Sequence, residues 1–303
     1  MSELSGYDVC IVSDGKPGHL NQSMGLVEAL QRKNANLAYQ VVEPSTPLAL
    51  LGFLIRCLWK KPIAGPRLVI AAGHRTHLTL LVYGWAWRAK TVLLMKPSLP
   101  VGLFDLSIIP QHDQPPARSD VIETLGVLNR MQPGEKRVNQ ALVLLGGPSK
   151  HFEWDNDTVN SQLRVWLEKN NDKVWTIATS RRTPKSWLSS FQSELKSLPE
   201  TLKVVPHEDT DSDWLKEELQ RAAACVVSED SVSMIYEALS AGCGVGLIQL
   251  KPLGDSRVVE GVNKLKVSGQ VKMLDACPTL SELSCTLREA DRCAQKIMEK
   301  GWL

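Results

Sequence analysis

The residue types best suited to bind a phosphate group lie in the segment VVSEDSVSMIYEALSAGCGVG, residues 226–246. A strand pattern ends at Val227, and a helical pattern begins near Ser231. The first N–H groups of such a helix lack partners within it, and with the helix dipole they favour an anion. The segment therefore predicts a diphosphate site, in which Glu237 is placed to reach a ribose. Its candidate ligands are Ser228, Ser231, Ser233 and Glu237.

A simpler interpretation of the same segment is an ordinary turn between a strand and a helix. Ser228 or Ser231 would then only cap the helix. Glu229 and Asp230 are poor neighbours for a phosphate, so a phosphate site requires both carboxylates to face away from the ligand.

Two further loops of the second half follow predicted strands. The first, GGPSK at 146–150, lets the backbone approach a ligand closely, and the second is TSRRTP at 179–184. Paired arginines suit phosphate because the guanidinium group is planar and donates two parallel hydrogen bonds. A tight turn and a solvated basic turn are the plainer alternatives. The candidate residues are Gly146, Gly147, Ser180, Arg181 and Arg182.

The first half carries residues of a catalytic type in the loop SDGKPGH, residues 13–19. Asp14 or His19 could act as a general base, and Lys16 could stabilise negative charge. The loop does not match GxGxxG, which argues against a dinucleotide cofactor. Neighbouring candidates for substrate binding are Gly15, Gly18, Asn21 and Gln22.

The loop GHRTH at 73–77 follows another predicted strand and adds His74 and Arg75 as candidate binding residues. His74 and His77 are three positions apart, but no third ligand is evident. We therefore expect hydrogen-bonding roles, no bound metal and no cofactor.

These loops are positioned by an alternation of strand and helix patterns that is typical of doubly wound parallel sheets. The predicted strands lie at 7–13, 39–43, 67–72, 91–95, 106–110, 141–145, 174–178, 203–205, 224–227 and 245–250. The predicted helices lie at 21–32, 157–169, 231–241 and 280–300. A polar stretch at 129–139 is the expected linker. We predict an α/β protein with Rossmann-like domains at 1–133 and 134–279 facing a central cleft, and a helix at 280–303 packing on the first domain.

Composition excludes several classes of protein. The formal net charge of +2 does not favour nucleic-acid binding, and the seven cysteines form no CxxC pair. The N-terminus does not resemble a signal peptide, so we expect a cytoplasmic location. The stretch PLALLGFLIRCLWKK at 47–61 is either a core helix or a peripheral contact with the inner membrane face, through Leu48–Lys61.

Five motifs taken together resemble one family. SDGKPGHLNQSMGLVEAL, AAGHRTH, FDLSIIPQHD, TSRRTP and VSEDSVSMIYEALSAG occur in this order, from Ser13 to about Gly246. They resemble the family named for the plant "elongated mitochondria" fission factor and its bacterial homologues. That resemblance implies a GT-B-like fold and, for bacterial members, transfer of envelope sugars. A more distant similarity links the chain to the N-acetylglucosaminyltransferase of peptidoglycan lipid-intermediate synthesis, although the first loop lacks that enzyme's repeated glycines.

The leading hypothesis is therefore a metal-independent glycosyltransferase. It would use a nucleotide-diphosphate sugar and an envelope or lipid-linked acceptor, with the nucleotide held by the second domain and the acceptor by the first. Two alternatives stay open. One is a non-hydrolysing sugar-nucleotide epimerase on the same fold, and the other is a non-catalytic adaptor of the mitochondrial-fission type.

Overall fold

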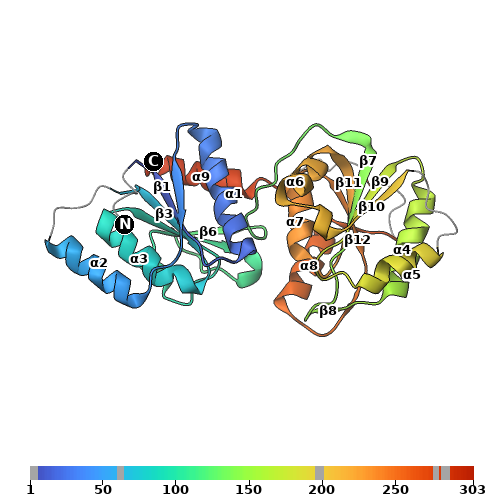
Figure 1. Ribbon diagram of the computed structural model, residues 1–303, viewed down its shortest axis with the longest axis horizontal. Helices are drawn as coiled ribbons and strands as arrows, with labels where there is room; N and C mark the ends of the chain where they lie inside the picture. Colours follow the sequence, from blue (N-terminus) through green and yellow to red (C-terminus); the bar gives the residue numbers. More distant parts are fainter. Residues whose placement is uncertain (1–5, 60–64, 195–200, 276–279, 281–286) are drawn as a thin grey trace. The chain divides into compact units, whose positions relative to one another are not determined.

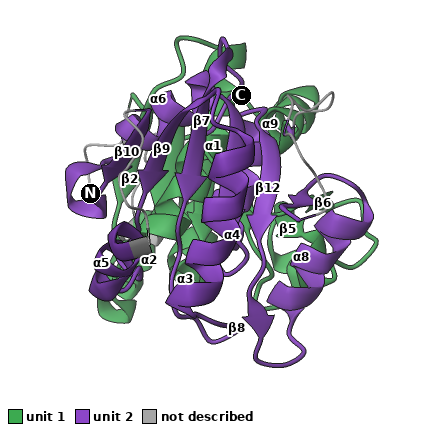
Figure 2. Cartoon of the chain, turned by 90° about the vertical axis from the view of Figure 1, so that its right-hand side faces the viewer, with its two compact units in different colours: residues 1–130, 288–303 green, residues 131–287 purple. Residues whose placement is uncertain are grey.

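The computed structural model describes residues 6–59, 65–194, 201–275, 280 and 287–303 (Figure 1). The chain divides into two compact units (Figure 2). Unit 1 comprises Met1–Arg130 and Arg288–Leu303, and unit 2 comprises Met131–Leu287. The expected linker at 129–139 overlaps the first strand of unit 2, which begins at Arg137.

Unit 1 contains a parallel sheet of six strands in the order β2-β1-β3-β4-β5-β6. Its strands are β1 (Val9–Val12), β2 (Tyr39–Val42), β3 (Leu68–Ala72), β4 (Lys90–Leu94), β5 (Leu106–Pro110) and β6 (Val121–Thr124). Its α-helices are α1 (Pro17–Lys33), α2 (Pro47–Trp59), α3 (His77–Trp87) and α9 (Glu289–Glu299). Short 3-10 turns lie at His74–Thr76, Val101–Leu103 and Gln111–Asp113.

Helices cover both faces of this sheet because its central strands are apolar throughout. Every residue of β1 and of β3 is buried, as expected for strands packed on two sides. On one face α1 and α9 lie side by side, and Leu26 and Ile297 belong to the same core (Figure 1). On the other face α2 and α3 form a second core, in which Phe53 packs edge-to-face on Tyr83.

Unit 2 contains a second parallel six-stranded sheet, in the order β10-β9-β7-β11-β12-β14. Its strands are β7 (Arg137–Leu144), β9 (Val174–Ala178), β10 (Leu202–Val205), β11 (Ala222–Ser228), β12 (Gly244–Ile248) and β14 (Lys272–Met273), and β8 (Phe152–Glu153) pairs with β13 (Lys251–Pro252). Its α-helices are α4 (Asn156–Lys169), α5 (Lys185–Glu194), α6 (Ser212–Arg221), α7 (Val232–Ser240) and α8 (Arg257–Val267), and a 3-10 turn lies at His207–Asp209.

Local sequence signals fix several helix starts in both units. Pro17 stands at the beginning of α1, where its missing N–H costs nothing, so this helix begins four residues before the predicted Asn21. The carboxylate of Asp155 accepts a hydrogen bond from the Thr158 N–H and caps α4. Ser256 caps α8 in the same way through the Val259 N–H.

The tail differs from its prediction. We expect a helix over 280–300, but α9 begins at Glu289, and residues 281–286 lie outside the described part of the chain. Of the three C-terminal cysteines, Cys293 lies in α9, and Cys277 and Cys285 fall outside the described residues. Cys293 is buried in unit 1, and burial raises its pKa to about 12. The thiol is therefore protonated at neutral pH and packs as an apolar group.

The apolar stretch at 47–61 forms α2, whose helix ends at Trp59. Leu50 and Phe53 point into the core, whereas Leu48, Leu51 and Ile55 are exposed. The core interpretation thus holds for one face of the helix and leaves a second apolar face uncovered. Among the described residues, no helix has the length and apolarity needed to cross a membrane.

Candidate functional site

In each unit the candidate loops flank the point at which the strand order reverses. In unit 1 that point lies between β1 and β3, and in unit 2 it lies between β7 and β11. The neighbouring strands end in register, with Val12 opposite Ala71 and Val227 opposite Leu144. Doubly wound proteins bind their ligands at this position, beyond the carboxyl ends of the strands.

In unit 2, three loops meet through direct hydrogen bonds. The hydroxyl of Ser228, at the end of β11, accepts from the N–H of Gly146 at 2.8 Å. Ser180 and Thr183, from the loop after β9, donate to the Gly146 carbonyl at 2.8 and 2.6 Å. A Cβ atom on Gly147 would lie 2.1 Å from the Arg182 carbonyl oxygen, so only glycine fits here. The structure therefore brings together Gly146, Gly147, Ser180, Arg182 and Ser228, as the sequence predicts for one site.

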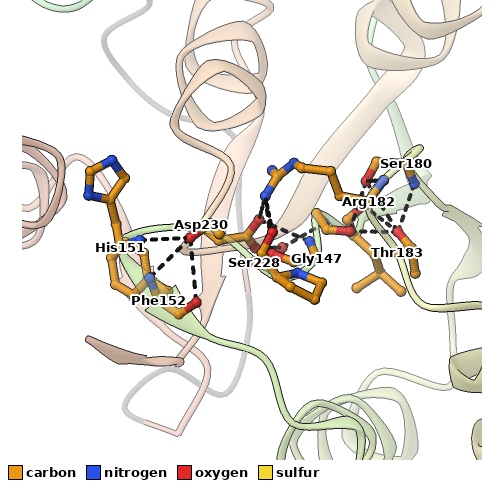
Figure 3. Close-up of polar contacts among 12 residues, drawn as sticks. Gly147, His151, Phe152, Ser180, Arg182, Thr183, Ser228 and Asp230 are labelled. Atoms are coloured by element: carbon orange, nitrogen blue, oxygen red, sulfur yellow. Dashed lines mark hydrogen bonds and ion pairs between the residues drawn. The ribbon is translucent and has the colours of Figure 1, made fainter. Parts of the chain in front are cut away.

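A buried carboxylate that the sequence did not identify as a ligand organises this cluster. Asp230 accepts hydrogen bonds from the Gly147 N–H at 2.9 Å and from the Ser228 hydroxyl at 2.7 Å. The Arg182 guanidinium forms an ion pair with Asp230 at 2.7 Å and also donates to the Gly147 carbonyl (Figure 3). The Asp230 side chain has no exposed surface. Arg182 therefore neutralises a protein carboxylate and holds the glycine loop, whereas Arg181, which is exposed as well, takes no part in these contacts.

Glu229 also faces the protein. One oxygen of its carboxylate accepts from the Leu250 N–H at 2.9 Å, and the other forms an ion pair with Lys266. Both acids of the SED sequence thus have partners inside unit 2. This arrangement satisfies the condition that the sequence analysis sets for a phosphate site at this loop.

The start of α7 lies directly after these acids. Ser231 is the residue before the helix, and its side chain makes no capping hydrogen bond. The simpler interpretation, in which Ser231 serves as the helix cap, is therefore not what the structure shows. Ser233 is exposed in the first turn, and Glu237 is half-buried one turn further on. The first N–H groups of α7 and the Ser233 hydroxyl belong to the same turn of the helix. Donors at the start of a helix are a common binding site for anions.

In unit 1, Asp14 and His19 form a pair across the turn that follows β1. The Nδ1 atom of His19 lies 3.0 and 3.1 Å from the two carboxylate oxygens of Asp14. The Asp14 side chain is fully buried, whereas 16 % of the His19 side chain is exposed. Lys16 is more distant, with its Nζ atom 3.8 Å from Asp14. Asp14 contacts the Nδ1 atom of His19, and the Nε2 atom is the ring nitrogen that faces away from this carboxylate.

The electrostatics of this pair assign different tasks to its members. Burial alone raises the pKa of Asp14, but hydrogen bonds from the Lys16 N–H and the His19 ring outweigh it, and the nearby His19 and Lys16 charges add to them. The net effect lowers the pKa of Asp14, so this carboxylate stays ionised at neutral pH and is a weak base. It orients His19 and stabilises the imidazolium that forms when Nε2 takes a proton.

Gly73, which is not among the predicted site residues, makes room for this pair. Its φ angle is +87°, and a Cβ atom there would lie 2.5 Å from the His19 ring and 3.2 Å from an Asp14 oxygen. The loop after β3 therefore touches the loop after β1 at the point of strand reversal. The predicted residues His74 and Arg75 follow Gly73 directly and are exposed.

The remaining candidate binding residues of unit 1 lie in α1 and in the loop before it. Gln22 is buried, and its amide contacts the Met95 sulfur at 3.6 Å, which joins α1 to the end of β4. Asn21 is half-buried, and Gly15 and Gly18 have open space around them.

His77 is held inside the protein, in contrast to its neighbour His74. Its Nδ1 atom lies 3.2 Å from the Ser98 hydroxyl, and its ring packs edge-to-face on Phe104. Burial and the nearby His74 lower the pKa of His77, which favours its neutral form. Among the described residues, no group of three or more His, Cys, Asp or Glu side chains is arranged to hold a metal ion.

Comparison with known sequences gives one family and one curated relative. A family model described as "Mitochondrial fission ELM1" matches residues 17–300. An uncharacterized protein of Rickettsia prowazekii (strain Madrid E), RP120, is 24 % identical, and the match covers 78 % of this chain and 81 % of the relative.

Comparison with solved structures supports the fold. A putative UDP-N-acetylglucosamine 2-epimerase from Listeria monocytogenes has a TM-score of 0.55 at 11 % identity, covering 97 % of this chain and 88 % of the epimerase. The UDP-GlcNAc 2-epimerase from Methanocaldococcus jannaschii has a TM-score of 0.52 at 11 % identity, covering 96 % and 99 % of the respective chains. At such identities the similarity establishes a GT-B-like, Rossmann-type architecture and nothing beyond it.

Proposed function

The chain belongs to the mitochondrial fission ELM1 family, and we propose that it is a metal-independent glycosyltransferase that uses a nucleotide-activated sugar. One observation carries the proposal. In each unit, polar loops lie where the strand order of the parallel sheet reverses. In unit 2 these loops include the glycine loop and the start of α7, which suit a phosphate. In unit 1 they include the Asp14–His19 pair, which suits a general base.

In the proposed complex, unit 2 binds the nucleotide diphosphate. The start of α7 and the exposed Arg181 face the phosphates, and Glu237 hydrogen-bonds the ribose. Gly146 and Gly147 let the backbone approach the ligand, while Asp230 and Arg182 hold their loop in shape. Helix dipole and guanidinium together stabilise the leaving diphosphate, which is why no metal is needed.

Unit 1 supplies the base in this proposal. His19 Nε2 removes a proton from the acceptor hydroxyl, and Asp14 holds the ring through Nδ1. The acceptor oxygen then attacks the anomeric carbon, the bond from that carbon to the diphosphate breaks, and the diphosphate leaves as the second product. The acceptor is proposed to be an envelope or lipid-linked glycan.

The nucleotide site is tested by isothermal titration of the full chain with uridine, cytidine, guanosine and adenosine diphosphates and their sugar conjugates. One of these should bind, and Arg181→Gln should weaken its binding about tenfold to a hundredfold, because one charge-assisted hydrogen bond contributes about 1.5–3 kcal/mol. Arg164→Gln is the matched control, since Arg164 is exposed on α4 and contacts Glu168 at 3.8 Å. A folded protein that binds none of the panel would overturn the proposal.

A sugar-nucleotide epimerase is the second candidate, and the similarity in fold to the two epimerases favours it. The reactions differ in what they need. An epimerase inverts its nucleotide sugar in the absence of acceptor, whereas the proposed transferase releases nucleoside diphosphate only as an acceptor is glycosylated. Incubation with the nucleotide sugar identified by titration, followed by NMR of the sugar, separates the two.

We further propose that α2 and α3 contact the surface of an anionic membrane. Leu48, Leu51 and Ile55 of α2 and Leu78 and Trp85 of α3 are exposed. Residues 44–104, which contain both helices, include no Asp or Glu. Their cations are Arg56, Lys60, Lys61, Arg75, Arg88 and Lys96, together with Arg67 and Lys90, which are paired with Asp8 and Asp105. Apolar side chains in an acid-free segment suit an anionic lipid surface.

Vesicle flotation tests this contact. The protein should float with phosphatidylglycerol vesicles and not with phosphatidylcholine vesicles, and the pair Leu51→Ser with Trp85→Ser should abolish flotation. Leu253→Ser with Val267→Ser, two exposed apolar residues of unit 2, is the matched control. Equal loss of flotation in both double variants would contradict a specific contact through α2 and α3.

A further inference from the structure

The sheet of unit 1 has two edges of different electrostatic character. At the edge where the strands begin, cations are neutralised by neighbouring carboxylates. Three ion pairs lie there: Arg67–Asp8 at 3.4 Å, Lys90–Asp105 at 2.8 Å and Arg118–Asp120 at 2.7 Å. Burial raises the pKa of Asp105, but hydrogen bonds from Lys90 and Thr91 outweigh it and lower that pKa, so the pair stays charged. This edge offers no excess of positive charge to a ligand.

The edge where the strands end is arranged differently. Lys16 follows β1, Arg75 follows β3 and Lys96 follows β4, and all three are exposed. Among the described residues, Arg75 has no ion-pair or hydrogen-bond partner, and Lys96 donates to a backbone carbonyl, that of Asp113, at 2.9 Å. In the described part of the chain, the acid that forms an ion pair with Lys16, at 3.8 Å, is Asp14, whose side chain is buried and bound to His19.

These cations come from neighbouring loops. β1, β3, β4 and β5 are consecutive in the sheet, and adjacent strands lie about 4.8 Å apart. Side-chain contacts join the loops in turn: Gly73 makes room for His19, Gln22 touches Met95, and Lys96 reaches the loop after β5. The three cations therefore line one continuous edge, with His19 among them.

The start of α3 adds to the positive potential of this edge. α3 begins at His77, directly after the turn that carries Arg75, and no acidic residue stands in its first turn, so the positive end of its dipole is not compensated there. α1 differs, because the Asp14 carboxylate accepts a hydrogen bond from the N–H of Lys16, the residue before that helix. A ligand that meets this edge encounters three cations and the start of α3.

We propose that this edge binds the phosphate or diphosphate group of an anionic acceptor, with Lys16, Arg75 and Lys96 as its ligands. The inference rests on the proposed transferase function and names the chemical class of its second substrate. The acceptor anion is held beside His19, so that its hydroxyl lies within reach of Nε2. Guanidinium and ammonium groups from separate loops bind the non-bridging oxygens of a phosphate from several sides.

Titration of the full chain tests the site with three probes: inorganic pyrophosphate, farnesyl diphosphate and the nucleoside diphosphate that binds unit 2. Arg75→Gln with Lys96→Gln should weaken farnesyl diphosphate binding tenfold or more and leave nucleoside diphosphate binding unchanged. Arg67→Gln with Lys90→Gln is the matched control, because it also removes two cations from unit 1 but at the opposite edge. Circular dichroism establishes that each variant is folded.

The three probes distinguish a free diphosphate from a lipid-linked one, and they test this site separately from the transferase function. Pyrophosphate bound as tightly as farnesyl diphosphate identifies a site for the diphosphate group itself, and tighter binding of farnesyl diphosphate identifies a lipid-linked ligand. Equal losses in both double variants, loss through Arg181→Gln instead, or no binding of either diphosphate would overturn the proposal. A chain that binds farnesyl diphosphate but no nucleotide keeps this site and loses the transferase function.

Discussion

Replacing His19 with glutamine is expected to lower the rate of sugar transfer by about 10²–10⁴-fold, the contribution of a positioned general base. Glutamine keeps the size and polarity of the side chain but cannot take up the proton at Nε2. The affinity for the nucleotide should stay unchanged, since His19 belongs to unit 1 and the nucleotide ligands belong to unit 2. Turnover of the nucleotide sugar identified by titration, measured with a saturating acceptor, gives the rate.

Three further variants, Asp14→Asn, its combination with His19→Gln, and Gly73→Ala, separate the base from the residues that position it. Asp14→Asn should also lower the rate, and the double variant should be little worse than His19→Gln alone, because the two residues act as a unit. Gly73→Ala should displace His19, since a Cβ atom would lie 2.5 Å from its ring. His207→Gln, a partly exposed histidine beside Glu208, is the control. A His19→Gln variant with full activity would remove His19 from the mechanism.

The same pair predicts a dependence of stability on pH. Because folding lowers the pKa of Asp14, its contribution to stability is present above about pH 4, the range of a free aspartate, and is lost as the pH falls through the folded value. Urea unfolding of the wild type and of Asp14→Asn should therefore differ most near pH 7, and the difference should shrink as the pH falls through the lowered pKa of Asp14. A difference that grows in acid would contradict the assignment of an ionised Asp14.

Replacing Asp230 with alanine is expected to lower the free energy of unfolding of unit 2 by about 2–6 kcal/mol. The substitution leaves the Gly147 N–H and the Ser228 hydroxyl without their acceptor, and such buried groups cost about 1–3 kcal/mol each when unpaired. Arg182 adds little, because 42 % of its side chain is exposed and water can solvate it. For a unit of this size the melting temperature should fall by roughly 4–24 °C.

The effect should extend to the ligand. A glycine loop released from Asp230 loses its fixed shape, so nucleotide affinity should fall together with stability. Asp172→Ala, an exposed acid of unit 2, should change stability by less than about 0.5 kcal/mol and leave affinity intact. If Asp230→Ala instead tightened nucleotide binding at unchanged stability, the carboxylate would be a neighbour of the phosphates, and the proposed site would be wrong.

Much of the fold was predictable because most of its strands are short runs rich in apolar residues. Predicted strands such as 174–178 and 106–110 agree with β9 and β5 at every residue. β6 was missed because VIET alternates and is only partly buried, which is expected of a strand at the sheet edge. The strand orders were not predictable either, since they depend on which crossovers reverse direction.

For the candidate site, the sequence indicated which loops come together, but it did not indicate what each residue in them contacts. Arginines 181 and 182 look equivalent in TSRRTP, yet only Arg182 meets a buried carboxylate. Asp230 looked like an obstacle to phosphate, and the structure shows it holding the loop from inside. Gly73 gave one signal, a glycine directly before His74, but only its positive φ angle and the nearby His19 ring explain it. Such pairings join residues far apart in sequence, so no local pattern records them.

The placement of α9 fixes an order of events during synthesis. Unit 1 consists of residues that precede unit 2 in the sequence and of residues that follow it. Among the latter, Cys293, Ala294 and Ile297 of α9 pack in the core of unit 1 beside α1. The ribosome therefore completes the whole of unit 2 before it releases the helix that unit 1 needs. Until α9 is released, the apolar face of α1 that packs against it stays exposed, and chaperones or other nascent chains can bind it. Unit 1, although translated first, therefore completes its core only after the whole of unit 2 has been synthesised.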